Sequence, residues 1–369
     1  MARRRARVSV RRAAAVESTM LTSLRLRHFR CYGSLRWEIP EPGALLLGEN
    51  AQGKTSLIEA VCVALSLHSP RAGRLNKLAQ HGCSDFGISL DTDTGTRRLV
   101  WEPRRLDMSV DGVARKDYTD YLADAPPVVW LGNKDMALVT GAAEQRREYL
   151  DFLGSQWHPE YRAHLLAYRK ALKSRNLLLR HPHPHAEALR SYARVLAGHG
   201  EVLLALRRQL LELLAPHITQ LHGRIAAQRQ EGVELRYVPS TPLPLEEALQ
   251  GCLEADLRAG FTTLGPHRDD LELCINGAAA AAYASEGQQR TLAIALILAQ
   301  AGLLSVETGQ APVLLIDDIF GELDPARRQA LLGALPEDSQ TFITTTHLHW
   351  LEDTPLPLPV QTISGAAIQ

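Results

Sequence analysis

The sequence predicts an α/β fold of the P-loop type, in which a mixed sheet surrounds a phosphate-binding helix and an α-helical arm is inserted into the chain. Two observations carry this prediction. A glycine loop of the form G-x-x-x-x-G-K-T, residues 48–55, follows an apolar run and opens a helical pattern. A second apolar run, residues 313–316, ends in two aspartates, as a buried parallel strand does where it meets a ligand.

The glycine loop predicts a nucleotide site. Gly48 and Gly53 let the backbone turn its N–H groups toward phosphate oxygens, and the helix N-terminus adds the positive end of its dipole. Lys54 is expected to reach the β- and γ-phosphates of ATP, and Thr55 to hold Mg²⁺. The predicted nucleotide-binding residues of this loop are Gly48, Glu49, Asn50, Ala51, Gln52, Gly53, Lys54 and Thr55.

The strand that ends at Asp317 and Asp318 has the pattern of a Walker B segment. Asp317 is expected to complete the Mg²⁺ shell with Thr55, and Asp318 to polarise the attacking water. Taken alone, two aspartates at a strand end fit a cap of the next loop equally well. Joined to a P-loop, they favour ATP hydrolysis.

A third element opens a long apolar helix. Ser285, Gly287 and Gln288 stand at its start, where a serine hydroxyl and free backbone N–H groups form an anion site. On its own this segment reads more simply as a capping box, with Ser285 as the N-cap and Gln288 at N3. Further segments follow the Walker B strand, G-E-L-D-P at residues 321–325 and T-T-T-H at residues 344–347.

These elements, in this order, resemble the ABC-type ATPase superfamily. Residues 21–32 and the G-P-H-R-D-D stretch within residues 263–271 are, more narrowly, similar to the RecF family of bacterial DNA replication and repair proteins. The resemblance runs from about Met20 to the C-terminus. One departure is G-N-K-D at residues 132–135, where the family usually has a P-E-D segment, so the residue that contacts the attacking water in this region is left open.

The resemblance implies a weak, DNA-stimulated ATPase whose cofactors are ATP and Mg²⁺. It implies an ATP-dependent homodimer in which Ser285 and Gly287 act on the nucleotide of the facing chain. Asp318 stands where related ATPases usually carry Glu, which suggests slow hydrolysis. His347 holds the position of the superfamily's switch histidine, and a plain polar residue at a strand end fits it equally well. The implied partners are RecO, RecR, and double-stranded DNA or single-strand/double-strand junctions bound without sequence preference.

Composition limits how such a protein reaches DNA. The formal net charge is zero, so phosphate contacts must come from a local basic stripe. Two expected arm helices, residues 159–179 and 185–230, carry the candidates: Arg162, Arg169, Lys170, Lys173, Arg175, Arg180, Arg207, Arg208, Arg224 and Arg229. The five scattered cysteines have no metal-ligand spacing and indicate reduced thiols in the cytoplasm.

Four segments are expected along the chain. Residues 1–19 are arginine-rich and form either a disordered extension or the product of a mis-assigned start. Residues 20–155 and 233–369 are the two halves of the ATPase lobe I, and residues 156–232 are the helical lobe II. Two other functions compete with a DNA clamp: a transporter-type ATPase subunit, disfavoured by the G-P-H-R-D-D segment, and a nucleotide-binding scaffold without hydrolysis, favoured only by Asp318.

Overall fold

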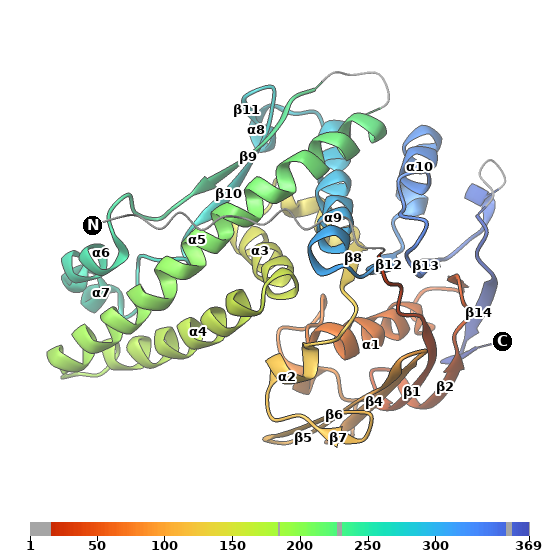
Figure 1. Cartoon of the computed structure of the whole chain (residues 1–369), viewed down its shortest axis with the longest axis horizontal. Helices are drawn as coiled ribbons and strands as arrows, with labels where there is room; N and C mark the ends of the chain where they lie inside the picture. Colours follow the sequence, from red (N-terminus) through yellow and green to blue (C-terminus); the bar gives the residue numbers. More distant parts are fainter. Residues whose placement is uncertain (1–15, 184, 227–230, 352–355, 369) are drawn as a thin grey trace.

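A parallel sheet holds the centre of the molecule (Figure 1). The computed structural model describes residues 16–183, 185–226, 231–351 and 356–368. The strand order of this sheet is β15-β14-β3-β13-β12-β8, and all neighbours are parallel except β14 and β15. Its strands are β3 (Gly43–Leu47), β8 (Val128–Gly132), β12 (Val313–Asp317), β13 (Thr341–Thr345), β14 (Val360–Ser364) and β15 (Ala367–Ile368). The apolar side chains of β3, β8, β12 and β13 are almost wholly buried, as expected for parallel strands covered on both faces.

A second, antiparallel sheet packs on the other side of helix α1 (Lys54–Ser66). Its order is β2-β1-β4-β5-β6-β7. The strands are β1 (Leu21–Phe29), β2 (Tyr32–Glu38), β4 (Phe86–Thr92), β5 (Gly95–Glu102), β6 (Arg105–Val110) and β7 (Val113–Ala114). Strands β4, β5 and β6 thus form two successive antiparallel hairpins. Because α1 is enclosed by both sheets, nearly all of its side chains are buried.

The arm is a pair of long helices that lie side by side at the left of Figure 1. Helix α4 (Pro159–Leu179) has the predicted bounds, and α5 (Ala186–Ile225) carries Pro216 in its interior. The predicted end of the second helix, residues 227–230, lies outside the described residues and includes Arg229. Helices α2 (Tyr118–Leu122) and α3 (Ala143–Trp157) connect the arm to the sheets.

The remaining elements return the chain to the central sheet. A small sheet of order β11-β10-β9, with α6 (Leu245–Gly251) and α7 (Leu253–Ala259) nearby, packs on α5. Its strands are β9 (Val233–Val238), β10 (Asp270–Ile275) and β11 (Ala278–Ala279). Short helices are η1 (Leu75–Lys77), η2 (Asn133–Leu138), η3 (Phe320–Glu322), η4 (His349–Leu351), α8 (Ala280–Tyr283) and α10 (Pro325–Leu332).

Helix α9 (Glu286–Thr308) is the central apolar helix of the larger hydrophobic core. Among the described residues it alone is long and apolar enough to cross a bilayer, and 72% of its most apolar window is buried inside the protein. Such burial is typical of a core helix that packs against strands and other helices. The five cysteines are all free.

The G-P-H-R-D-D segment fastens the arm to the rest of the chain. The ring of His267 lies 2.7 Å from the Tyr168 hydroxyl of α4 and 3.0 Å from the Thr262 carbonyl oxygen. The Asp269 carboxylate accepts hydrogen bonds from Tyr237 and from the Ser240 backbone. Polar groups buried this way fix one relative position of the segments that they join. His267 therefore helps to hold this segment against α4.

Two of the predicted DNA-binding arginines are instead buried in ion pairs. Arg175 donates to Asp256 at 2.6 Å, and both side chains are fully buried. Arg207 donates to Asp151 at 2.8 Å and also to the Pro266 carbonyl oxygen at 2.7 Å. The prediction that these two residues belong to an exposed basic stripe is wrong, because helical spacing alone does not show which face a neighbouring segment covers.

The end of the arginine-rich extension is tied to the protein. Glu17 pairs in parallel with Gln310, its backbone N–H donating to Gly309 and its carbonyl accepting from Ala311. Residues 1–15 lie outside the described residues.

We predict that replacing Arg175 with Met lowers the free energy of unfolding by about 3–5 kcal/mol, because it leaves the Asp256 carboxylate buried and unpaired. Urea unfolding followed by circular dichroism measures the change. Arg36→Met is the control, since its ion pair with Glu38 is largely exposed and contributes about 1 kcal/mol or less. An unchanged midpoint in the Arg175 variant would show that the buried pair is not required.

Candidate nucleotide site

The glycine loop lies where β3 passes into α1, at the carboxyl edge of the central sheet. Gly53 has a φ of 113°, and a Cβ at this position would lie 2.5 Å from the Tyr32 hydroxyl oxygen. A Cβ on Gly48 would lie 2.4 Å from the Ile363 carbonyl oxygen. Both positions therefore require glycine, and Ala51 between them also has a positive φ of 65°. Open N–H groups in such a turn suit an anion.

Lys54 folds back over this loop. Its Nζ atom donates to the carbonyl oxygens of Gly48 at 2.5 Å and Glu49 at 2.8 Å. The side chain is only 6% exposed, and this burial lowers the pKa of its amine, while the charges of Asp318 and Asp317 act in the opposite direction. The predicted loop, from Gly48 through Glu49, Asn50, Ala51, Gln52 and Gly53 to Lys54 and Thr55, is thus one compact unit with its cation at the centre.

The tip of β12 meets the start of α1 at Thr55. The Thr55 hydroxyl donates to Asp317 Oδ1 at 2.7 Å, and the Thr344 hydroxyl of β13 donates to the same oxygen at 2.8 Å. Burial raises the pKa of Asp317, and these two hydrogen bonds oppose the rise. The structure therefore brings together the two residues predicted to hold Mg²⁺, although they lie far apart in the sequence.

These donors suit Mg²⁺ better than a metal ion that takes all of its ligands from the protein. A hydroxyl and a carboxylate offer hard oxygen ligands, which Mg²⁺ prefers, with the remaining positions left to water and phosphate. Within the described part of the chain, no three His, Cys, Asp or Glu residues form a metal-binding group. Thr55 and Asp317 would hold the ion, whose chemistry here is to neutralise charge on phosphate oxygens.

Asp318 follows Asp317 in a left-handed conformation, with a φ of 51°. Its N–H lies 3.1 Å from the Thr344 hydroxyl oxygen, which it approaches as a donor. The Asn133 amide donates to Glu322 Oε1 at 2.9 Å and lies 3.5 Å from the Asp318 carbonyl oxygen. Asn133 belongs to the 132–135 segment, whose sequence departs from the family pattern, and it lies at the C-terminal end of the predicted Walker B strand. The sequence did not show which residue of this segment lies beside Asp318, because the pairing of β8 with β12 is what brings Asn133 to this position.

His347 lies beside the turn that follows β12. Its ring Cε1 is 3.3 Å from the point where a Cβ on Gly321 would lie, and its Nδ1 is 3.0 Å from the Thr346 hydroxyl oxygen. Among the described residues, no hydrogen bond joins His347 to Lys54 or Asp318. It follows the end of β13 and faces the turn that contains Gly321.

The third predicted element lies apart from the P-loop. Ser285 caps α9, and Ser285 and Gln288 form the complete capping box. Gly287 is pressed against Arg327, because a Cβ there would lie 2.4 Å from a guanidinium nitrogen. These residues line a cavity of about 280 Å³ that contains none of residues 48–55. The two predicted groups of nucleotide-binding residues therefore lie apart within one chain.

Hydrogen bonds connect the start of α9 with the backbone of Asp318 through the turn after β12. Arg290 of α9 donates to the Glu322 carbonyl oxygen at 3.0 Å. The Glu322 side chain accepts from Asn133, which also reaches the backbone of Asp318. A chain of hydrogen bonds thus runs from the first turns of α9 to the backbone of Asp318.

Comparison with known proteins agrees with this geometry. A family model described as an AAA domain matches residues 23–113. The DNA replication and repair protein RecF of Synechococcus sp. (strain JA-2-3B'a(2-13)) is 38% identical over 349 residues, which cover 89% of this chain and 91% of that protein. RecF of Anaeromyxobacter sp. (strain Fw109-5) is 35% identical over 351 residues, covering 90% and 94%.

The chain belongs to the RecF family. A solved structure of the recombination mediator protein RecF with ATP, in the RecFOR pathway, has a TM-score of 0.85 and 26% identity, and the match covers 96% of this chain and 98% of that one. An Smc head bound to the C-winged helix domain of ScpA, 14% identical with a TM-score of 0.52 over 95% and 97% of the chains, shares the fold. The predicted ATPase head with an inserted helical arm is confirmed.

Within residues 132–135 of this RecF-family chain, Asp135 turns inward. Its carboxylate accepts from the Gly132 N–H at 2.7 Å, and burial raises the pKa of Asp135 to about 6. The folded protein therefore binds this proton more tightly than the unfolded chain, whose aspartates titrate near 3.9. The carboxyl group stabilises the fold fully below about pH 4, and this contribution is lost as the pH rises through about 6.

We predict that Asp135→Asn raises the free energy of unfolding by up to about 3 kcal/mol at about pH 7.5, because the amide keeps an acceptor for Gly132 without a buried charge. The variant should therefore unfold at a higher urea concentration than the parent. The difference should shrink steadily as the pH falls toward about 4. Paired urea titrations across this range test it. A constant difference at every pH would show that the pKa of Asp135 is not raised by folding.

Proposed function

We propose that this chain is an ATP-gated DNA-binding protein of recombinational repair and replication restart, with slow, DNA-stimulated ATP hydrolysis. ATP drives two heads together on DNA, and hydrolysis releases them. The observation that carries this proposal is the separation of two half-sites on one chain, with Lys54, Thr55 and Asp317 in one and Ser285 with Gly287 in the other.

The P-loop half-site supports the ATPase part of the proposal. Lys54 is poised to exchange its two carbonyl partners for β- and γ-phosphate oxygens. Asp318, held by Thr344 and beside Asn133, is the group that would orient the water and accept its proton. Being one methylene shorter than Glu, this carboxylate reaches less far toward the phosphate, which favours slow turnover. His347 is proposed as the γ-phosphate contact that reports ATP.

The second half-site supports the dimer. Ser285 and the N-terminus of α9 form an anion-binding end on an exposed surface, remote from the chain's own P-loop. A facing chain's nucleotide would satisfy Ser285, Gly287 and Gln288 and join the two heads. Ligand bound between two chains stabilises their association by mass action. The hydrogen bonds from Arg290 through Glu322 and Asn133 would then couple a nucleotide held at the start of α9 to the backbone of Asp318.

The helical arm supports DNA binding, through fewer residues than the sequence predicts. Lys170, Lys173, Arg180 and Arg208 are exposed, and none of them forms an ion pair among the described residues. Arg224 is exposed and donates to the Gly333 carbonyl oxygen. Dimerisation doubles such a stripe in a protein with no net charge, which gives phosphate affinity without base recognition. RecO and RecR are the proposed partners in loading a recombinase at single-strand gaps, and the cytoplasm is the proposed location.

We predict that Lys54→Ala weakens ATP binding at least about tenfold, since it removes a charge-assisted phosphate contact. Asp318→Asn should keep ATP affinity within about twofold but lower the rate of phosphate release about 100-fold, the usual contribution of a general base. Asparagine also tolerates the left-handed backbone at residue 318. Equal turnover in parent and Asp318→Asn would remove the water-activating role, and no turnover in the parent would favour a scaffold that binds without hydrolysis.

We predict that DNA affinity depends on both the dimer and the arm. Ser285→Arg should bind ATP yet stay monomeric by light scattering, whereas Lys170→Glu/Lys173→Glu should double its mass with ATP but bind duplex DNA about tenfold more weakly at low salt. Arg36→Glu/Arg105→Glu, a charge reversal on two exposed β-sheet arginines, is the matched control and should leave DNA affinity within about twofold. Equal DNA affinity with ADP and with a non-hydrolysable ATP analogue would contradict ATP gating.

A further inference from the structure

A buried carboxylate, that of Glu231, lies beside the start of α9. The Glu231 side chain is 6% exposed and lines the cavity of about 280 Å³ that also contains Ser285 and Gln288. Burying a charged group is costly unless the group is paired and hydrogen-bonded. The contacts of this carboxylate therefore show what its burial stabilises.

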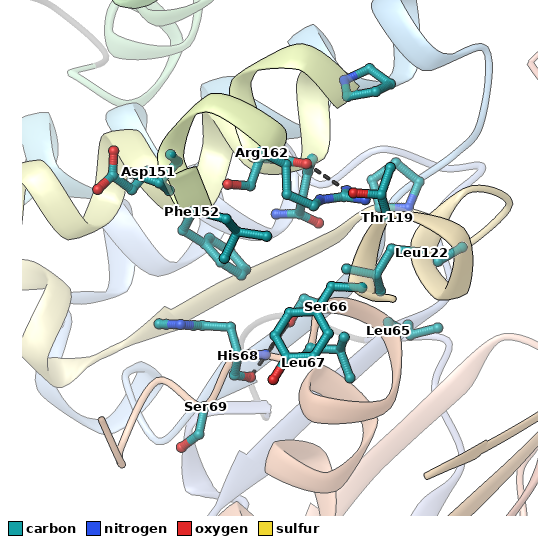
Figure 2. A pocket seen from close by; sticks show the side chains of 18 of the residues that line it. Leu65, Ser66, Leu67, His68, Ser69, Thr119, Leu122, Asp151, Phe152 and Arg162 are labelled. Carbon is teal, nitrogen blue, oxygen red and sulfur yellow. Dashed lines mark hydrogen bonds between the residues drawn. The ribbon is translucent and has the colours of Figure 1, made fainter. Parts of the chain in front are cut away.

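A larger cavity, about 620 Å³, is separate from this one. It lies at the C-terminal end of α1, with Leu67 and His68 on one side and Phe152 and Arg162 on the other (Figure 2). It contains none of the predicted nucleotide-binding residues. Of these two cavities, the smaller is therefore the one where a buried charge acts on the predicted nucleotide contacts.

The two oxygens of Glu231 contact different parts of the chain. Oε1 accepts a hydrogen bond from Gln288 Nε2 of α9 at 2.7 Å. Oε2 lies 3.5 Å from Nε2 of His222, a fully buried residue of the arm helix α5. The carboxylate thus lies between the arm and the first turn of α9.

The contact with Glu231 decides which way the Gln288 amide faces. An ionised carboxylate can only accept hydrogen bonds, so the NH₂ group of Gln288 must face it. The amide oxygen then faces the Ser285 backbone N–H, which donates to it at 2.8 Å. If the amide were turned over, two donor groups would face each other at Ser285 and this hydrogen bond would be lost. Glu231 therefore selects the orientation that completes the capping box of α9.

The completed capping box leaves two donors at the helix end for an anion. Ser285 Oγ accepts from the Gln288 N–H at 3.4 Å, and a hydroxyl group that accepts can still donate its own hydrogen. The N–H of Gly287, in the first turn of α9, has no acceptor within the helix. The helix dipole favours negative charge at the same end.

We propose that Glu231 is a positioning residue for the start of α9. By holding the Gln288 amide in one orientation, it keeps Ser285 and Gly287 in the geometry that receives the nucleotide of a facing chain. Its effect on ATP rests on the dimer proposed above, whereas its hold on Gln288 does not. Because Glu231 acts as a hydrogen-bond acceptor, its role requires an acceptor at residue 231 and not a negative charge.

Hydrogen–deuterium exchange of the full-length protein without nucleotide, resolved to single amides, tests this hold directly. In Glu231→Ala the Ser285 amide should exchange about fivefold faster than in the parent, since loss of a helix cap has an effect of this size. Glu231→Gln should stay within about twofold of the parent, because its amide keeps an acceptor for Gln288. Glu234→Ala is the matched control and should leave this exchange unchanged: Glu234 of β9 is half exposed, pairs with Arg236 and does not line the cavity.

Exchanging the two side chains gives a test that a general loss of folding cannot imitate. Gln288→Glu alone sets two carboxylates against each other and should speed exchange at Ser285 at least about threefold. Glu231→Gln/Gln288→Glu reverses donor and acceptor, and a glutamate at N3 also completes a capping box. Exchange in this double variant should therefore return to within about twofold of the parent.

Light scattering with ATP measures the consequence for the dimer. Glu231→Ala should raise the dissociation constant of the ATP-bound dimer at least about threefold, because a symmetric dimer contains the altered geometry twice. Glu231→Gln should dimerise like the parent. ATP affinity at protein concentrations that keep the chain monomeric should be unchanged, since none of residues 48–55 lines this cavity.

Several results would overturn the positioning role. They are unchanged exchange at Ser285 in Glu231→Ala, equal effects of Glu231→Ala and either Glu231→Gln or Glu234→Ala, and failure of the double variant to restore exchange. Altered exchange with unaltered dimerisation would overturn the link between this geometry and the facing nucleotide. A parent that stays monomeric with ATP, but shows the expected exchange, would overturn the proposed dimer while confirming that Glu231 holds Gln288.

Discussion

The hydrogen bond between the Thr55 hydroxyl and Asp317 Oδ1 joins two parts of the chain that are 262 residues apart. It forms only if β3, β13 and β12 are parallel and in one register, with Thr344 opposite Asp317 and Leu46 opposite Thr344. The whole helical arm is inserted between the two partners of this bond. The nucleotide site, the position of the arm and the placement of α9 therefore all depend on correct assembly of three short, buried strands.

The sequence predicts those parts of the protein whose pattern is local. The P-loop, the strand that ends at Asp317 and the bounds of α4 follow from glycine spacing, apolar runs and a proline at the helix start. Asn133 could not be found this way, because only the pairing of β8 with β12 brings it to the site. The burial of Arg175 and Arg207 was missed for the same reason: their carboxylate partners come from α7 and α3.

The buried polar groups of the arm divide its charges into two kinds. Arg175 and Arg207 hold the G-P-H-R-D-D segment and α7 against the long helices, where a missing partner is costly. Lys170 and Lys173, on the exposed face of α4, are free to meet an anionic surface. Stiffness of the arm and its affinity for phosphate thus come from different residues of the same two helices, so either property can change without the other.

The strand order of the central sheet also constrains how the chain is made. The antiparallel sheet is complete once residue 114 has been synthesised, whereas among the described residues β3 pairs with β13 and β14 alone, and β8 with β12 alone. About 290 residues separate β3 from β13, which at ~5–20 residues per second is roughly 15–60 s of translation. During this time two of the most apolar strands have no partner. The nascent chain therefore carries unpaired apolar strands through most of its synthesis, and the nucleotide site can fold only after β13, in the last eighth of the protein, has been made.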